Sequence, residues 1–197
     1  VLDEADKMLD LGFEEELEKV LQIIPNSRQN LLFSATYEKK VENIASKITQ
    51  KAIFISIEEK PIVQNITQRA ISVNKENRSA LLRELISKNS WKKILVFMAN
   101  KRSCDNIAFK FRKNNLSAVS FHSDLTQEER NETLNEFKEN KIKILFATDI
   151  MARGIHIDDI ECVVNFDLPR ASADYIHRIG RTARAGKSGT AISFIGL

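Results

Sequence analysis

The stretch ILVFMANKRSCDNIAFKF, residues 94–111, decides the fold class of this chain. Its first four residues are apolar without alternation, which is typical of a β-strand that is buried on both faces. From Cys104 onward the apolar residues take helical spacing, because Ile107, Ala108 and Phe111 fall on the same helix face. A doubly buried strand that leads into an amphipathic helix indicates an α/β fold with a parallel sheet.

The same alternation of apolar runs and amphipathic stretches extends along the whole chain. Helical faces are expected within residues 13–24 and 81–86, where apolar residues recur every three or four positions. Further strands are expected at NLLFSAT (30–36), AIFIS (52–56), AVSF (118–121), ILFAT (144–148), VVNF (163–166) and AISFI (191–195).

The segment EEKPIVQNIT, residues 58–67, carries charge, Pro61 and no clear period, so it is interpreted as a linker. The expected parts are a first domain at 1–58, a linker at 59–66 and a second domain at 67–197. The second part is long enough for a complete open sheet. The first is not, so the chain is expected to be a fragment that begins inside a domain. Its three expected strands are Val1–Leu2, Leu31–Phe33 and Ile53–Ile57.

The composition indicates a soluble globular protein, with 43% hydrophobic and 29% charged residues among 197. A formal net charge of +3 is compatible with a polyanionic partner but does not identify one. Cys104 and Cys162 are far apart and lack paired spacing, which argues against a disulfide framework and favours a reducing cytoplasm. Neither a signal peptide nor an apolar run of membrane length is present in the sequence, so no membrane partner is expected.

Three carboxylates, Asp3, Glu4 and Asp6, follow the apolar pair that starts the chain. Ligands of open α/β sheets bind beyond the carboxyl ends of strands, which is where Asp3 and Glu4 are expected. Clustered carboxylates repel one another unless a cation offsets the repulsion, and a magnesium–phosphate site supplies one. Asp3 could hold Mg²⁺ through water, and Glu4 could orient or deprotonate an attacking water. The alternative is an acidic helix cap, with Asp6 ahead of a short helix.

The stretch YIHRIGRTARAGKSG repeats arginine every third residue, at Arg178, Arg181 and Arg184. This spacing predicts one positive ridge, and arginine suits forked recognition of phosphate oxygens. The alternative is a solvated basic helix face or a plain nucleic-acid patch, which the helix-disfavouring Gly180 argues against. The Gly-Lys-Ser that begins at Gly186 is not a P-loop, because the required earlier glycine is missing and a strand follows instead of a helix.

Taken together, these motifs show that the sequence resembles the DEAD-box RNA helicases, which are superfamily 2 ATPases, and its wording is closest to bacterial members. The likeness runs from the DEAD motif through most of the second RecA-like domain, in the order of the family. The matching segments are Asp3–Asp6 (motif II), Ser34–Thr36 (motif III), ILVFMANKR ending at Arg102 (motif IV), HSDLTQEER at 122–130, Thr148–Asp149 with Ala152–Gly154 (motif V) and His177–Gly186 (motif VI).

The resemblance implies that ATP and Mg²⁺ are cofactors. Asp3 and Glu4 would bind Mg²⁺ and position water, with Asp3 holding the metal through a water molecule. Arg181 and Arg184 would reach the γ-phosphate as arginine fingers, and His177 would join the cleft from the opposite domain. The residues that would contact the nucleotide or couple its hydrolysis to strand separation are Asp6, Ser34, Thr36, Arg153, Gly154 and His156.

The resemblance also implies RNA as the partner. Binding would use phosphates and sugars, so it would be independent of sequence and sensitive to salt. Discrimination between RNA and DNA would use the 2′-hydroxyl. The implied RNA-binding residues are Asn100, Lys101, Arg102, His122, Ser123, Gln127, Arg130 and Thr148.

Three positions depart from the family pattern. Ala183 replaces a usual glycine, a single added methyl that should be tolerated, and Ser123 replaces the glycine of the HG pair. His156 replaces the aspartate that faces the ATP ribose in relatives, which puts that contact in doubt. A surface histidine is the alternative interpretation of His156.

The mechanism that the resemblance implies is a two-domain clamp, in which ATP and RNA close the cleft and a short duplex is disrupted locally. The alternatives are a non-catalytic RNA-binding clamp and a superfamily 2 DNA helicase. The intact Glu4, Thr36 and arginine fingers argue against the first, and the DEAD, SAT and HRIGRT segments argue against the second. Because this chain contains no P-loop, it is expected to be inactive as an ATPase by itself.

Overall fold

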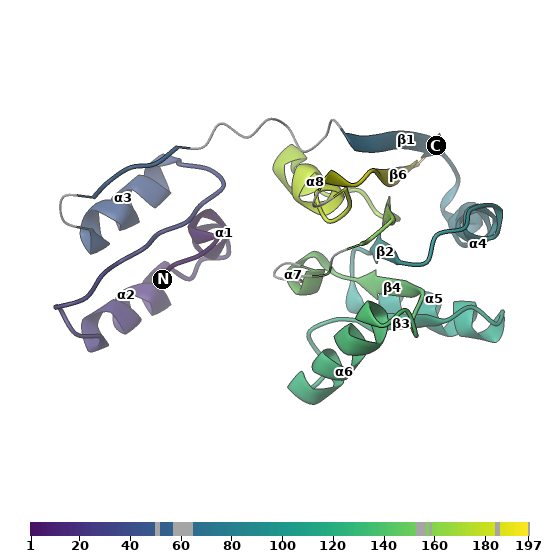
Figure 1. Cartoon of the computed structure of the whole chain (residues 1–197), viewed down its shortest axis with the longest axis horizontal. Helices are drawn as coiled ribbons and strands as arrows, with labels where there is room; N and C mark the ends of the chain where they lie inside the picture. The colour runs from purple at the N-terminus through teal and green to yellow at the C-terminus, as the bar shows by residue number, and fades with distance from the viewer. Residues whose placement is uncertain (50–51, 57–64, 153–156, 158, 184–185, 197) are drawn as a thin grey trace. The chain divides into compact units, whose positions relative to one another are not determined.

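The computed structural model describes residues 1–49, 52–56, 65–152, 157, 159–183 and 186–196. The chain divides into two compact units, Val1–Glu58 and Glu59–Leu197 (Figure 1). Most of the predicted linker at 59–66 lies outside the described residues, so its conformation stays a prediction.

In the part of the first unit that the structure describes, three helices surround a small apolar core. These are α1 (Ala5–Asp10), α2 (Glu14–Ile23) and α3 (Lys39–Ile48), and α1 packs against α3. Apolar residues recur every three or four positions in these helices, and the face that they form packs into the core. The buried residues of this core are Ala5, Leu9, Leu17, Val41, Ile44 and Ile48.

The strands predicted in the first unit are mostly wrong. Leu2 forms a single parallel bridge with Leu32, held by bonds from Leu2 N to Leu31 O (2.8 Å) and from Phe33 N to Leu2 O (2.8 Å). Residues 53–56 form no strand, and Phe54 is 66% exposed. An extended apolar segment becomes a strand only with a hydrogen-bonded neighbour, and none lies beside 53–56 within the described part of the chain.

The second unit is a six-stranded parallel sheet flanked by helices, which confirms the predicted α/β class. The strand order is β1-β6-β5-β2-β4-β3. None of the helices that the structure describes is long and apolar enough to cross a membrane. The strands are β1 (Ile66–Ser72), β2 (Ile94–Phe97), β3 (Ala118–Phe121), β4 (Ile144–Ala147), β5 (Cys162–Asn165) and β6 (Gly189–Ile195). The helices are α4 (Arg78–Lys88), α5 (Lys101–Lys113), α6 (Gln127–Lys138), α7 (Asp149–Ala152) and α8 (Ser172–Ile179), with a 3₁₀ turn at Lys75–Asn77.

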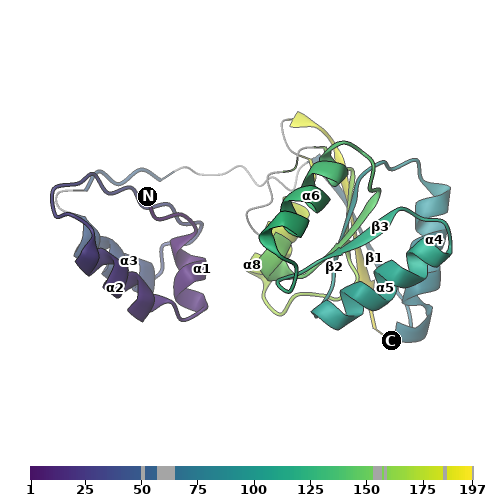
Figure 2. The same cartoon turned by 90° about the horizontal axis from the view of Figure 1, so that it is seen from below.

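The central strands are buried on both faces, as their unbroken apolar runs predict. In β4, Ile144 and Phe146 enter the core beneath α4 and α5, whereas Leu145 and Ala147 enter the core beneath α6 and α7. Figure 2 shows α4 and α5 on one side of the sheet and α6 and α8 on the other. The two layers fix the strands from both sides, so the strand ends are held rigidly.

The edge strand β1 is a strand that the sequence interpretation missed. It begins at Ile66, inside the predicted linker, and pairs in parallel with β6 along its whole length, from Ile66 opposite Gly189 to Ser72 opposite Ile195. Most of its side chains are exposed. Because an edge strand has one neighbour and little burial, it lacks the apolar run that marks the central strands.

The carboxyl ends of four strands meet at one edge of this sheet. Asn100 follows β2, His122 follows β3, Thr148 follows β4 and Asp167 follows β5. Since these strands are parallel neighbours, the loops after them are neighbours too. Most of the residues implied in RNA binding are therefore gathered on this edge.

Candidate functional site

Motifs II and III are joined by side-chain hydrogen bonds in the first unit. Ser34 Oγ accepts from Asp6 N (3.1 Å) and donates to Thr36 O (2.7 Å). Thr36 Oγ1 donates to Asp6 Oδ2 (3.1 Å). The Asp6 carboxylate is buried, and its other oxygen, Oδ1, has no hydrogen-bond partner among the described residues. Asp6 is thus held by both hydroxyls and keeps one acceptor atom for a further donor.

The alternative role of Asp6 as a helix cap is wrong. Helix α1 begins at Ala5, and Glu4 occupies the N-cap position without a side-chain cap. Asp6 lies within the first turn of the helix, and its carboxylate is bonded to Thr36 from the other motif. Among the three carboxylates, Asp6 therefore belongs to the contact between the two motifs.

Asp3 and Glu4 stand at the turn between the Leu2 bridge and α1. Asp3 is exposed, and its Oδ1 accepts from Glu4 N (2.9 Å). Glu4 has a left-handed backbone (φ 48°), an uncommon conformation for a non-glycine residue. The bond from Ala5 N to Phe33 O (3.1 Å) holds the turn in place. Strained backbone of this kind is concentrated at functional sites.

In the second unit, several residues implied in RNA binding support the loops at the sheet edge. Asn100 caps α5, because its Oδ1 accepts from Ser103 N (2.9 Å). Lys101 Nζ contacts Asp124 Oδ1 (2.5 Å), and the pair links the loop after β2 to the loop after β3. Arg102 is exposed on the first turn of α5.

The loop after β3 is anchored at its start by a buried histidine. His122 Nε2 lies 2.9 Å from Asp105 Oδ1, which also accepts from Ser120 Oγ (2.6 Å). Burial acts to raise the pKa of Asp105, but the hydrogen bonds from Ser120 and His122 outweigh it, so this pKa lies below its ordinary value. His122 Nδ1 is buried, without a partner in the described part of the chain. Asp105 was not identified from the sequence.

The rest of that loop is held by α6. Arg130 Nη2 donates to the carbonyl oxygen of Ser123 (2.7 Å), and Thr126 and Glu129 form a capping box. Gln127 Nε2 donates to Asn131 Oδ1 (3.0 Å) on the same helix. Arg130 therefore holds the carbonyl of Ser123, while the side chains of Ser123 and Gln127 remain exposed.

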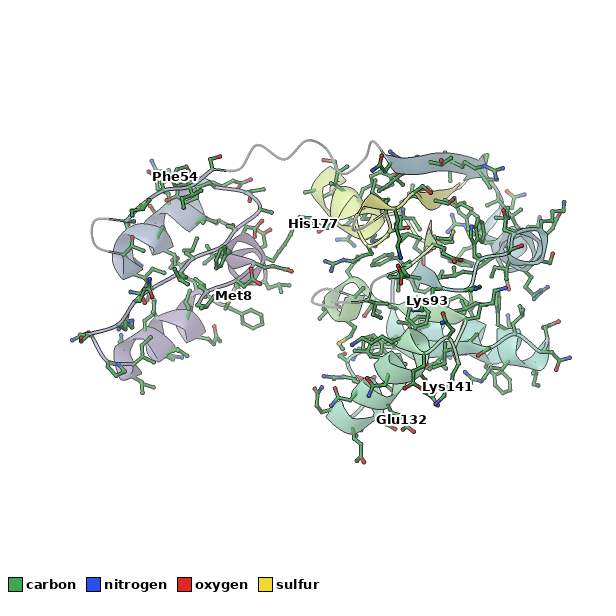
Figure 3. The ribbon with its side chains drawn as sticks, in the orientation of Figure 1. Met8, Phe54, Lys93, Glu132, Lys141 and His177 are labelled. Carbon is green, nitrogen blue, oxygen red and sulfur yellow. The ribbon has the colours of Figure 1, made fainter. Side chains whose placement is uncertain are left out.

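Motif VI does not form the ridge of three arginines that its spacing predicts. Arg178 is only 4% exposed and points into the unit, whereas Arg181 is half-buried. The physical reason is that α8 ends at Ile179, so helical spacing does not extend to Arg181. His177 is half-buried on α8 (Figure 3). Arg184 lies outside the described residues, as do Arg153, Gly154 and His156.

The partners of Arg178 come from three strand ends. Its Nε and Nη2 donate to Asp149 Oδ1 (2.6 Å) and Oδ2 (2.7 Å), directly after Thr148. Its Nη1 donates to Asn165 Oδ1 (3.1 Å) and to Asp167 O (2.6 Å), and its guanidinium lies 4.8 Å from the ring centre of Phe97. These roles were missed, although polar residues at the end of an apolar strand are a signal that could have found Asn165 and Asp167.

Ala183, which stands where the family usually has glycine, has a left-handed backbone (φ 57°). Glycine adopts this conformation without the steric cost that Cβ imposes on alanine. The departure is therefore accommodated with backbone strain.

Two hollows of the second unit lie away from the site residues predicted above. One, of about 680 Å³, is lined mainly by α6 carboxylates and includes Glu132 and Lys141. The other, of about 300 Å³, includes Lys93 and Asp159 near the amino ends of β2 and β5. Figure 3 labels Lys93, Glu132 and Lys141. None of the predicted site residues lines either hollow.

Two family models match the chain. The DEAD/DEAH box helicase model matches residues 1–44, and the helicase conserved C-terminal domain model matches residues 76–186. Among curated relatives, the probable ATP-dependent RNA helicase ddx3 of Dictyostelium discoideum is 42% identical and matches 98% of this chain and 28% of its own length. The ATP-dependent RNA helicase RhlB of Pseudomonas syringae is 40% identical, over 100% of this chain and 50% of its own.

Solved structures give the same result. Saccharomyces cerevisiae Dbp5 bound to RNA and ADP BeF3 matches with a TM-score of 0.84 and 32% identity, over 100% of this chain and 52% of that one. Escherichia coli SrmB bound to RraA matches with a TM-score of 0.64 and 36% identity, over 68% of this chain and 79% of that one. The chain spans 27% to 50% of the length of the first curated relatives. Its motifs, its RecA-like sheet and these matches agree, and the chain belongs to the DEAD-box family of superfamily 2 RNA helicases.

Proposed function

We propose that the protein to which this chain belongs is an ATP-dependent RNA helicase that unwinds short duplexes locally. Closure of two RecA-like domains around ATP and RNA would drive the unwinding. The observation that carries this proposal is the hydrogen-bonded contact of Asp6 with Ser34 and Thr36. It joins the acidic motif to the hydroxyl motif, so a change at one can be transmitted to the other.

On the nucleotide side, Asp3 and Glu4 have separate roles. Asp3 is exposed, and Mg²⁺ in nucleotide sites is usually held by one or two carboxylates together with phosphates and water, so Asp3 fits such a site. Mg²⁺, when bound, would neutralise phosphate charge. Glu4, fixed by its turn, would orient the attacking water and take up its proton, and Arg181 and Arg184 would stabilise charge on the γ-phosphate.

On the RNA side, the carboxyl edge of the second unit would bind the sugar–phosphate backbone. The anchoring of the loop after β3 by Asp105 and Arg130 supports this role, because it fixes the backbone of His122 and Ser123 before RNA binds. Arg102 and Lys101 would supply positive charge. Contacts to sugars and phosphates do not read the bases, so RNA binding would be independent of sequence.

A cytoplasmic location is part of the proposal. It is supported by the two free, buried cysteines, Cys104 and Cys162, which suit a reducing compartment.

The test is the ATPase rate of the full-length protein with and without added RNA or DNA. RNA should accelerate ATP hydrolysis, and DNA of equal length should do so far less. Equal stimulation by both nucleic acids would favour a DNA helicase, and binding of RNA without any ATP hydrolysis would favour a non-catalytic clamp.

A further inference from the structure

Arg178 is an arginine of motif VI that the proposed phosphate-binding role does not use. It is almost completely buried, and its guanidinium makes four hydrogen bonds to the protein. Two of them form a forked pair with the Asp149 carboxylate. A lysine could supply the charge here but not the fork, so the geometry is specific to arginine.

The bonds of Arg178 reach the loops that carry the proposed RNA contacts. Asp149 directly follows Thr148, whose carbonyl oxygen accepts from Met151 N (3.1 Å) and starts α7. The carbonyl of Asp167 accepts from Arg178, and its carboxylate oxygen Oδ2 accepts from Ala99 N (2.9 Å). Ala99 is the residue before Asn100. The loops after β2, β4 and β5 are thus tied to one buried side chain.

The same residue is tied to the proposed nucleotide contact through the backbone. Arg181 N donates to the carbonyl oxygen of Arg178 (3.1 Å) at the end of α8. A shift of Arg178 along α8 therefore moves Arg181 directly. The Phe97 ring beneath the guanidinium and the buried Asn165 beside it leave Arg178 little freedom to shift without its partners.

We infer that Arg178 is a positioning residue that couples the RNA-binding strand ends to Arg181. When RNA changes the position of Thr148 and Asp149, the forked pair transmits that change to α8 and to Arg181. This inference rests on the proposed function, because it assigns the path by which RNA would stimulate ATP hydrolysis.

The test uses the full-length protein and two variants of the pair. Arg178→Lys keeps the charge but loses the fork, and Asp149→Asn keeps the shape but presents an amide donor to the Arg178 donors. In each variant the ratio of kcat with RNA to kcat without RNA should fall roughly tenfold, within the range by which coupling residues act. The KM for ATP and the nucleotide-free Kd for RNA should stay within about twofold, since neither residue is proposed to touch a ligand.

Arg78→Lys is the matched control. Arg78 begins α4, and its Nη1 bonds to the same Asp167, at Oδ1 (3.1 Å), and to Phe166 O (2.9 Å). The Arg78 side chain is also largely buried, at 13% exposure. Its hydrogen bonds to described residues go to Phe166 and Asp167 and not to α8. This variant should lower the melting temperature and keep the RNA-stimulation ratio.

Two results would overturn the inference. One is a ratio within about twofold of the unmodified protein in both pair variants; the other is an equal loss in Arg78→Lys, which would make the network merely structural. If Arg178→Lys does not fold, Asp149→Asn alone decides. Absence of RNA stimulation in the unmodified protein would instead contradict the proposed function, so the two failures are distinguishable.

Discussion

The hydroxyl of Thr36 should be worth much more to the first unit than an average surface hydroxyl. Thr36→Val keeps the shape of the side chain and removes the donor to Asp6 Oδ2. Because Oδ1 already lacks a partner among the described residues, the variant would remove the one side-chain donor that the buried carboxylate has there. Loss of a hydrogen bond to a charged group costs about 1.5–3 kcal/mol, so we expect a loss of about 2 kcal/mol in local stability.

The assay is amide hydrogen exchange of the full-length protein at the amides of Ala5, Asp6 and Phe33. These amides bond across the two motifs, to Phe33 O, Ser34 Oγ and Leu2 O, so their exchange reports opening of this contact. A loss of about 2 kcal/mol corresponds to roughly 30-fold faster exchange, at about 1.4 kcal/mol per factor of ten.

Thr49→Val is the matched control for this prediction. The Thr49 hydroxyl donates to Ala45 O (2.6 Å), a carbonyl that also accepts from Thr49 N (2.9 Å), so its removal leaves no buried group unpaired. Exchange in the control should change little. If Thr36→Val changes exchange by less than about twofold, or by no more than the control does, the reasoning about a buried, singly supported carboxylate is refuted.

Four further outcomes are expected. Glu4→Gln in the full-length protein should keep ATP-dependent RNA binding while turnover collapses, and a parallel loss of both would contradict the role given to Glu4. Arg181→Lys and Arg184→Lys should each cut turnover at saturating ATP and RNA by up to roughly 10³-fold, and near-normal turnover in both would exclude arginine fingers. Ala183→Gly should relieve the left-handed strain and raise the unfolding free energy by about 1 kcal/mol in chemical denaturation; no gain would show that the strain is negligible. Burial raises the pKa of the Cys104 thiol to about 12, from 9.0. Between these two values the thiol ionises in the unfolded chain and not in the folded one, so the unfolding free energy measured by chemical denaturation should fall as pH rises through this window. A Cys104→Ala variant with the same pH profile would refute this.

The sheet of the second unit was predictable where strands are buried on both faces. The runs at β2 and β4 have no polar alternation because two separate cores take their alternate side chains. The edge strand β1 was missed because one neighbour and an exposed surface leave it with polar residues such as Gln68 and Arg69. Burial therefore decides whether a strand can be recognised from its composition.

Strands that need distant partners were over-predicted. Residues 53–56 have the composition of a strand, but a strand is a property of a pair of segments. Leu31–Phe33 contributes one bridge for the same reason, since its described partner is Leu2 alone. Local sequence records the preference for extended backbone and cannot record whether a neighbour is present.

In the candidate site, the sequence did not reveal which groups the motif side chains bond to. The family resemblance implied that Asn100, His122 and Arg130 contact RNA, and the structure shows each of them bonded to the protein itself, to Ser103 N, Asp105 and Ser123 O. The same holds for Arg178, whose position in a basic motif suggested an exposed phosphate ligand. A motif marks a position where a residue type is required, but the requirement can be to hold a loop as well as to touch a ligand.

This distinction bears on how sequence-independent binding can be achieved. A surface that contacts the sugar–phosphate backbone needs donors at fixed positions more than it needs many mobile charges, because side-chain ordering opposes binding. Arg130 fixes the Ser123 carbonyl, His122 is anchored to Asp105, and Asn100 fixes the start of α5. Side chains that bond to the loops thus hold the backbone at the strand ends in place, and Arg178 connects these strand ends to α8, the helix that carries His177.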